Sequence, residues 1–295
     1  MAFVGGAPGV RLLKTLSPTG QSKACPDGRP PAYQNTSKLE VLFGDRVWDE
    51  TRGKVVVDFG CGEGHEVVEL AEHGARRVIG IEKNPGWLDR ATARIVERGV
   101  ADRCTVIREW TGPAAAADVI VCLDSFEHFK DPAAILLTMH RLMKPGGCVL
   151  VTFGPLWYHP YGGHLFSVFP YAHLIFSEHA MLTWRSLLPG KEPKPSLLAA
   201  GINKMTIKRF EQLVQNSPFK FASFEAVPIR RLRWVRVAGL REFTTSIVRC
   251  RLESAALDAA VVFSGCPSNL TSRSSEFGNC DGFSCSSDLK PENPR

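Results

Sequence analysis

No run of 18 or more uninterrupted apolar residues occurs in this 295-residue sequence, so it predicts no transmembrane helix. The first residues lack the basic start, apolar core and small-residue cleavage site of a signal peptide, and we therefore expect a cytoplasmic protein. Internal repeats and coiled-coil heptads are also missing from the sequence. With 44% hydrophobic and 22% charged residues, the composition is that of an ordinary globular chain, which excludes disorder as the main structure.

Cysteine occurs nine times, an odd number that does not fit a framework of paired disulfides. Four cysteines fall in the predicted sheet and its loops, where we expect buried free thiols: Cys61, Cys104, Cys122 and Cys148. Three more stand near the end of the sequence, at spacings that match no metal-ligand template: Cys266, Cys280 and Cys285.

The two ends of the chain differ in composition from its middle. Residues 1–37 are rich in Gly, Pro, Ser and Lys without a sustained period, and they predict a flexible N-terminal tail. Residues 256–295 become rich in Ser, Asn, Gly and Pro, and they predict a disordered C-terminal tail. Between the tails we expect one domain, residues 38–255, with an insertion at 154–203.

Short β-branched runs alternate with helical patterns through this domain. The predicted strands cover 55–59, 77–82, 104–108, 118–123 and 148–153, and the predicted helices cover 64–73, 85–98, 132–143 and 206–216. Strands joined by crossover helices pair in parallel, so we predict a doubly wound, Rossmann-like α/β fold. Two later strand-like runs, 220–228 and 243–252, are placed to close the sheet antiparallel. The substrate site is then expected outside the carboxyl ends of the parallel strands.

A glycine-rich turn joins the first predicted strand to the first helix, in the segment Asp58-Phe-Gly-Cys-Gly-Glu-Gly64. Glycines let the backbone approach a ligand, and the following helix N-terminus supplies free N–H groups. The next strand ends at Glu82, where a carboxylate is placed to accept hydrogen bonds from ribose hydroxyls. A glycine pattern alone is weak evidence, because dinucleotide-binding turns share it.

These residues together with two later segments resemble the class I S-adenosylmethionine-dependent methyltransferases. Lys144-Pro-Gly-Gly147 is similar to the turn before the family's fifth strand. Asp124-Ser-Phe-Glu-His-Phe-Lys-Asp-Pro132 is similar to the segment after the fourth strand in the branch that includes quinone-biosynthesis and many small-molecule methyltransferases. The resemblance implies S-adenosylmethionine as cofactor and a seven-stranded sheet whose last strand is antiparallel.

Carried over position by position, the resemblance implies a cofactor site made of Asp58, Gly60, Gly62, Gly64, Glu82, Glu109, Trp110, Asp124 and Ser125. The three glycines and the acid before them would approach the methionine part, and Glu82 would hold the ribose. Glu109 and Trp110 would lie near the adenine, and Asp124 with Ser125 would line the methyl end.

Transfer of a methyl group from a sulfonium relies on positioning, so a general base is optional. If the acceptor is a hydroxyl, four residues are candidates to receive its proton: Glu127, His128, His159 and His164. The alternative is that the Glu127-His128 pair orders its loop and caps the next helix.

Asp124-x-x-Glu127-His128 is also similar to a pattern for which a divalent metal is implied in some quinone O-methyltransferases. Three ligands from five consecutive residues are a weak template, so the metal stays open.

The insertion after the fifth strand, residues 154–203, is rich in aromatic side chains and histidines. It begins beside the expected site and predicts either the acceptor pocket with its lid or a second hydrophobic mini-core. Its histidines are spaced in a way that fits no zinc template: His159, His164, His173 and His179.

Positive charge is concentrated near the end of the domain, with eleven Lys or Arg against three Glu between residues 204 and 251. The densest part, 229–236, leaves a peripheral membrane contact or polymer docking open.

We interpret the chain as a methyltransferase acting on an oxygen or carbon of a small, apolar or aromatic acceptor. The alternatives are an RNA or protein methyltransferase that docks through 229–236, and a non-catalytic partner-binding module. Asp124-Ser-Phe-Glu stands where a base-flipping motif would follow the fourth strand, which disfavours nucleic acid.

Overall fold

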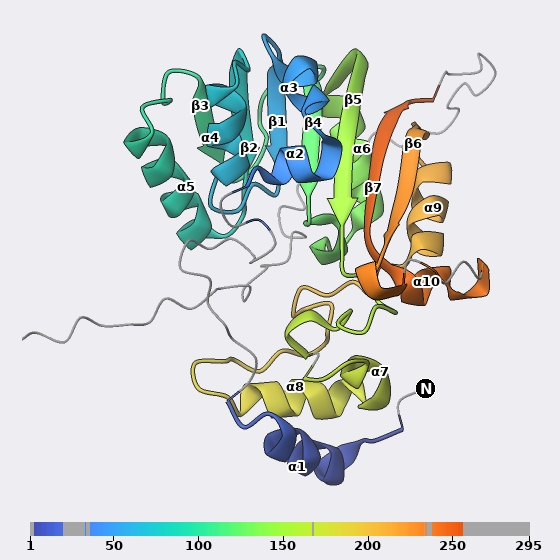
Figure 1. Cartoon of the computed structure of the whole chain (residues 1–295). Coiled ribbons are helices and arrows are strands. Elements are labelled where there is room, and N and C mark those ends of the chain that lie inside the picture. The colour runs from blue at the N-terminus through green and yellow to red at the C-terminus, as the bar shows by residue number, and fades with distance from the viewer. Residues whose placement is uncertain are drawn as a thin grey trace, which may run out of the picture.

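The computed structural model describes residues 3–19, 33, 36–166, 168–232, 234 and 238–255 (Figure 1). The predicted C-terminal tail and its three cysteines lie outside these residues, as does part of the basic segment 229–236. No described helix has the length and apolar character needed to cross a bilayer.

One seven-stranded sheet has the order β3-β2-β1-β4-β5-β7-β6. Its strands are β1 (Val55–Phe59), β2 (Arg77–Ile81), β3 (Cys104–Ile107), β4 (Ala117–Leu123), β5 (Met143–Phe153), β6 (Phe219–Pro228) and β7 (Thr245–Ser254). The first five pair in parallel, and β7 lies antiparallel to both of its neighbours. The predicted fold class is therefore confirmed, with the early strand boundaries displaced by one residue at most and β5 beginning earlier than expected.

Helices cover both faces of this sheet because successive strand residues point to opposite sides. One face packs on α4 (His65–Glu72), α5 (Pro85–Glu97) and the short helices α2 (Lys38–Phe43) and α3 (Arg46–Thr51). The other face packs on α6 (Pro132–Leu142) and α9 (Ile207–Gln215). The four predicted thiols Cys61, Cys104, Cys122 and Cys148 are buried and free, and Cys250 joins them. Both layers of the sheet core are thus apolar and contain no disulfide among the described cysteines.

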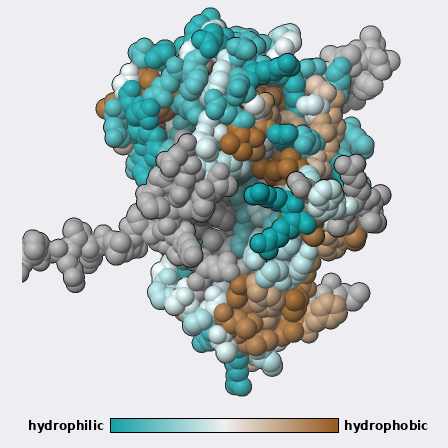
Figure 2. Space-filling model, in the orientation of Figure 1, coloured by the Kyte–Doolittle hydropathy of each residue, from teal (hydrophilic) through white to brown (hydrophobic). Residues whose placement is uncertain are grey.

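A second hydrophobic core lies below the sheet in Figure 1 and forms what we call the lobe. It combines the insertion, with α7 (Ala172–Ile175) and α8 (Glu178–Ser186), and the N-terminal helix α1 (Gly6–Leu16). Figure 2 shows apolar residues gathered over the lobe. The predicted mini-core is therefore present, built from the N-terminal helix and from the insertion in the middle of the chain.

The predicted flexible tail is wrong for residues 3–18, which form α1 and its flanks. Gly9 lies so close to α8 that an added Cβ would be 3.2 Å from the Cβ of Ala180. Leu13 is fully buried in the lobe, and the indole Nε1 of Trp184 donates to the carbonyl of Ser17 at 3.2 Å. An isolated helix of this length is marginal in water, so α1 is held by these tertiary contacts rather than by its own propensity.

Candidate functional site

The three glycines of the turn after β1 all have positive φ, but they serve different purposes. A Cβ on Gly60 would lie 2.6 Å from the Oγ of Ser125, and a Cβ on Gly64 would lie 2.9 Å from the Cβ of Ala91. A Cβ on Gly62 would meet no atom of the described residues within 4 Å. Gly60 and Gly64 therefore permit close packing of the turn against β4 and α5, whereas Gly62 is the glycine that faces open space.

Glu82 follows β2 and fixes the shape of the turn. Its Oε2 accepts a hydrogen bond from the N–H of Gly62 at 3.0 Å, and its Oε1 accepts one from the N–H of Asn84 at 2.8 Å. Burial raises the pKa of Glu82, and the backbone hydrogen bonds oppose that rise. Each carboxylate oxygen has a further lone pair, so Glu82 can still accept from ribose hydroxyls as expected.

Asp58 ends β1 almost completely buried, at 2% exposure. Among the described residues its Oδ2 has no hydrogen-bond partner. Burial raises the pKa of Asp58 well above its usual range, Glu66 adds to the rise, and the cation of Lys38 opposes it. A buried carboxylate with an oxygen that no described residue bonds fits a ligand that carries positive charge and hydrogen-bond donors, as S-adenosylmethionine does.

Asp124 and Ser125 follow β4 and lie beside the turn as expected. Ser125 donates its hydroxyl to the carbonyls of Gly60 and Leu123, at 3.2 and 3.1 Å, so this hydroxyl secures the turn. Asp124 accepts a hydrogen bond from the hydroxyl of Thr152 at 3.1 Å through its Oδ1. Both residues thus tie the turn and β5 to the end of β4.

Lys38, at the start of α2, was missed by sequence reasoning. Its Nζ lies 3.0 Å from the Oδ2 of Asp124, and its side chain is only 13% exposed. The neighbouring anions raise the pKa of Lys38 despite its burial, with Asp124 the largest of them. A lone lysine in a polar stretch carries no local signal, because its partner stands far away in the sequence.

The adenine end of the site is less enclosed. Glu109 is exposed, whereas Trp110 is half-buried against the sheet core and donates its Nε1 to the carbonyl of Pro113 at 3.2 Å. Both residues follow β3, next to β2 and therefore on the same side as Glu82. Their contact with adenine remains a prediction.

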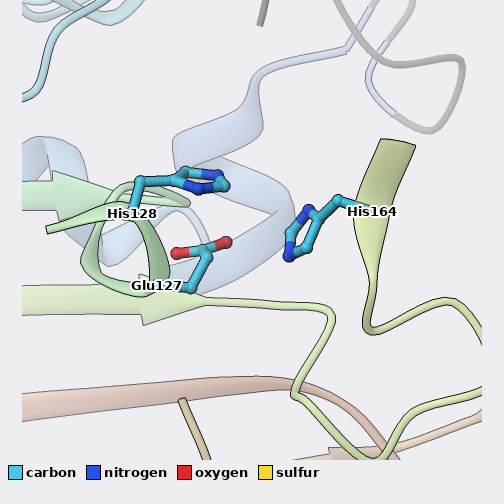
Figure 3. A group of neighbouring side chains, drawn as sticks. All are labelled: Glu127, His128 and His164. Carbon is cyan, nitrogen blue, oxygen red and sulfur yellow. The ribbon is translucent and has the colours of Figure 1, made fainter. Parts of the chain in front are cut away.

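Three side chains meet just beyond this edge of the sheet. Glu127 and His128 belong to the short helix after β4, η2 (Phe126–His128), and His164 begins η3 (His164–Phe166) in the lobe. A ligand atom of each lies within 4.8 Å of the others. Figure 3 shows the carboxylate of Glu127 directed between the two imidazole rings. The structure thus brings together three of the four predicted catalytic residues.

Burial governs the protonation of this cluster. It raises the pKa of Glu127 to about 8, with the nearby Asp124 carboxylate as the next cause. It also lowers the pKa of His128 and that of His164, the latter well below its usual range. Both imidazoles are therefore neutral near pH 7.

His159, the fourth predicted residue, lies outside this cluster. Its Nδ1 accepts a hydrogen bond from the N–H of Tyr161 at 3.0 Å, and burial lowers its pKa to about 4. His173 bonds instead to the carbonyl of Trp157 at 2.6 Å, and His179 is exposed on α8. The four histidines of the insertion therefore have different hydrogen-bond partners and different exposure.

Both ends of the insertion are attached to Glu127. The N–H of Gly154 donates to its Oε1 at 3.0 Å, and the N–H of Asn203 donates to its backbone carbonyl at 3.1 Å. Capping of α6, the alternative role considered for the Glu127-His128 pair, belongs to Asp131, which accepts from the N–H of Ala134 at 3.0 Å. The pair does order its loop, and the unused Oε2 of Glu127 leaves room for a second role.

Three arginines near the end of the domain form ion pairs. Arg241 pairs with Glu211 at 3.0 Å, and Arg249 pairs with Glu225 at 2.7 Å. Arg251 pairs with Glu50 and Glu253. These three arginines therefore have carboxylate partners within the fold, whereas Arg233 and Arg236 of the basic segment lie outside the described residues.

Comparison with known proteins agrees with this geometry. The methyltransferase domain family matches residues 32–221, well over half of the chain. The ubiquinone biosynthesis O-methyltransferase of Pseudomonas aeruginosa strain UCBPP-PA14 is 38% identical over 103 residues, which are 34% of this chain and 44% of that protein. The protein of the same name from Neisseria meningitidis serogroup C is 33% identical over 119 residues, 39% of this chain and 49% of that protein. The matched part thus spans about half the length of these curated relatives.

Solved structures confirm the fold. An S-adenosylmethionine-dependent methyltransferase from Mesorhizobium loti superposes with a TM-score of 0.50 at 18% identity, covering 75% of this chain and 99% of that one. The [4+2]-cyclase SpnF superposes with a TM-score of 0.51 at 14% identity, covering 86% of this chain and 99% of that one. The expected family, fold class and cofactor are confirmed: the chain belongs to the methyltransferase domain family, in the class I group whose methyl donor is S-adenosylmethionine.

Proposed function

We propose that this protein transfers a methyl group from S-adenosylmethionine to an oxygen or carbon of a small, apolar or aromatic acceptor. The observation that carries the proposal is the meeting of His164, from the lobe, with Glu127 and His128. The latter two lie at the carboxyl ends of β1, β2 and β4, which we call the cofactor edge of the sheet. Polar groups able to take a proton therefore stand between a cofactor site and an apolar lobe, as expected for a small-molecule site.

The cofactor, when bound, supplies a methyl group on a positively charged sulfur that a nucleophile attacks in line. The chain then has to hold the donor, orient the acceptor and take up a proton. Glu82 and Asp58 hold the donor through their remaining acceptor lone pairs. Burial keeps His128 and His164 neutral, so each has a ring nitrogen able to receive the proton of an acceptor hydroxyl.

The lobe supports an apolar acceptor. Its core places Phe166 and Trp157 next to the segment that carries His164. The relatives named as O-methyltransferases support oxygen as the accepting atom, over the part of the chain that they match. The specific acceptor is the part of the proposal that experiment has to supply.

Docking of RNA or of a protein through 229–236 is the second candidate, and it is tested by the same assay with an RNA or a protein as acceptor. A non-catalytic module stays an outcome of the test, because a fold by itself does not fix a function.

The first experiment is a calorimetric titration of the purified chain with S-adenosylmethionine and S-adenosylhomocysteine, with NAD as the control ligand. We expect micromolar binding of the first two and none of NAD. Asp58→Ala and Glu82→Ala should each weaken binding by about 1–3 kcal/mol, because each leaves polar groups of the ligand without a partner. A folded protein that binds neither compound would support the non-catalytic module instead.

Turnover is then measured with a panel of hydroxylated aromatic acceptors by following formation of S-adenosylhomocysteine. We expect His164→Ala to lower turnover strongly while cofactor affinity stays within about twofold, since His164 belongs to the lobe rather than to the cofactor turn. His179→Ala, an exposed histidine of the same lobe, is the matched control. Equal turnover in both variants would remove His164 from the proposed site.

A further inference from the structure

A groove of about 380 Å³ runs between α1 and α8 in the lobe. Small side chains of α1 form one wall, at Gly6, Ala7 and Val10, and α8 forms the other with His179 and Thr183. This volume lies within the range of sites that hold small molecules. In Figure 1, α8 lies between α1 and the sheet, and no residue assigned to the cofactor lines the groove among those described. The groove is therefore separate from the cofactor edge.

Two cations of α1 stand at this groove. Arg11 and Lys14 are three residues apart on the helix, so their side chains are neighbours on one face. Both are exposed, and neither forms an ion pair with another described residue. Like charges that are neighbours on a helix repel each other, so an anion held between them would remove an unfavourable interaction.

No acidic side chain is among the described residues that line the groove. The first 26 residues of the chain contain neither Asp nor Glu. Glu178, in the first turn of α8, is already engaged, because its two oxygens accept from the N–H of Leu197 and from Lys204, at 2.8 Å each. The groove thus combines positive charge with free space, which is the complement of a small anion.

The donors around the groove match a phosphate group. A guanidinium donates two parallel hydrogen bonds to a phosphate, and an ammonium adds a compact positive charge. The hydroxyl of Thr183 is a further donor, on the opposite wall. A phosphate monoester has three terminal oxygens and up to two negative charges, which suits two cations and a hydroxyl better than a singly charged carboxylate does.

We propose that the groove between α1 and α8 binds the phosphate group of a small anionic ligand, held by Arg11, Lys14 and Thr183. This site goes beyond the proposed function and does not depend on it, because no residue proposed for methyl transfer takes part. The ligand also joins α1 to α8, and so fastens the N-terminal helix to the insertion.

The test is calorimetric titration of the full chain with inorganic phosphate, in a buffer without other multivalent anions. We expect one site with a Kd below about 1 mM. Arg11→Gln and Lys14→Gln should each weaken binding by at least about tenfold, since each removes a hydrogen bond between charged groups. Both side chains are exposed, so neither change should unfold the lobe. Lys191→Gln, a lysine of the same insertion that does not line the groove, should keep the affinity within about twofold.

A variant that fills the groove separates shape from charge. Ala7→Phe places a large side chain in the groove and keeps both cations, and it should weaken phosphate binding by at least about tenfold. Ala7 is exposed, so the unfolding midpoint should stay close to that of the wild type. Weaker binding in the charge variants together with full affinity in Ala7→Phe would overturn the groove as the site.

A lipid headgroup offers the same phosphate chemistry as a soluble ligand, and a second titration distinguishes the two sources. The probe is vesicles of phosphatidylcholine that contain phosphatidic acid, compared with vesicles of phosphatidylcholine alone. Binding to the first vesicles that Arg11→Gln and Ala7→Phe abolish, without binding of inorganic phosphate, would assign the phosphate to a lipid. Binding of neither probe, or binding that no groove variant weakens, would overturn the site. Calorimetry with S-adenosylmethionine on the same samples reports separately on the proposed function.

Discussion

The buried polar groups at the cofactor edge of the sheet and those in the lobe differ in whether they have hydrogen-bond partners. In the lobe, the buried Trp184 donates to a backbone carbonyl, and the buried His173 is hydrogen-bonded to the carbonyl of Trp157 at 2.6 Å. At the cofactor edge, Asp58 and Glu127 each keep a buried oxygen with no hydrogen-bond partner among the described residues. Polar groups in the lobe thus stabilise the fold, whereas those at the edge carry an energetic cost that a ligand can remove.

The largest expected effect concerns the lobe alone. Trp184→Ala should destabilise it by about 3–5 kcal/mol, because the side chain is 1% exposed and the change leaves a large cavity and an unpaired Ser17 carbonyl. Urea unfolding should show an early transition, while calorimetric affinity for S-adenosylmethionine remains. Leu187→Ala, on an exposed side chain of the lobe, should have almost no effect on stability. A parallel loss of cofactor affinity in Trp184→Ala would mean that the two regions fold as one unit.

Next in size is a matched pair of glycine variants at the cofactor edge. Gly60→Ala should cost about 3 kcal/mol of stability, from the collision with Ser125 and the strain of its positive φ. Gly62→Ala should cost only about 1–2 kcal/mol, because it has the strain without the collision. Cofactor affinity should nonetheless fall in Gly62→Ala, whose methyl group enters the open space. Similar unfolding midpoints for both variants would contradict this division of roles.

A smaller effect is expected from the ion pair that joins α2 to the site. Lys38→Met should lower the free energy of unfolding by about 2 kcal/mol, because it leaves the carboxylate of Asp124 without its cation. The double variant Lys38→Met/Asp124→Asn should recover at least half of that loss. A purely additive double variant, with no recovery, would show that the pair contributes nothing by its pairing.

The smallest effect is a pH dependence at Asp58. Its pKa is raised in the folded state, so between the unfolded and folded values the native protein holds the proton more tightly, and stability falls as pH rises through this window. We therefore subtract the free energy of unfolding of Asp58→Asn from that of the wild type. This difference should decline with increasing pH, by at most about 1.4 kcal/mol per pH unit for one group. A difference that rises with pH would mean that the folded protein stabilises the charged form.

The sheet and its turn are predictable because their signals are local. A strand, a glycine turn and a helix follow one another between Val55 and Glu72, and Glu82 ends the next strand, so short-range patterns specify them. The same reasoning gave Glu127 and His128 as candidates. The hydrophobic pattern and the glycines within these short segments are enough to predict the elements. No contact between distant segments is needed.

The remainder depends on contacts between distant segments. His164 reaches the cluster only because the lobe folds back over the sheet, and Lys38 becomes important only when α2 places it beside Asp124. Residues 6–9, Gly-Ala-Pro-Gly, have the composition of a flexible tail, yet tight packing of Gly9 on Ala180 makes them the start of α1. Sequence patterns cannot reveal such contacts, because propensity is overridden by tertiary packing.

The attachment of both ends of the insertion to Glu127 has an engineering consequence. Gly154 and Asn203 both bond to Glu127, so the two ends of a replacement segment would meet at one residue, with the bond between His128 and the Gly201 carbonyl also to be kept. If the lobe forms the acceptor site as proposed, its exchange should alter acceptor preference while strand pairing is kept. Chimeras that swap residues 155–202 together with a compatible α1 are the natural libraries for this scaffold.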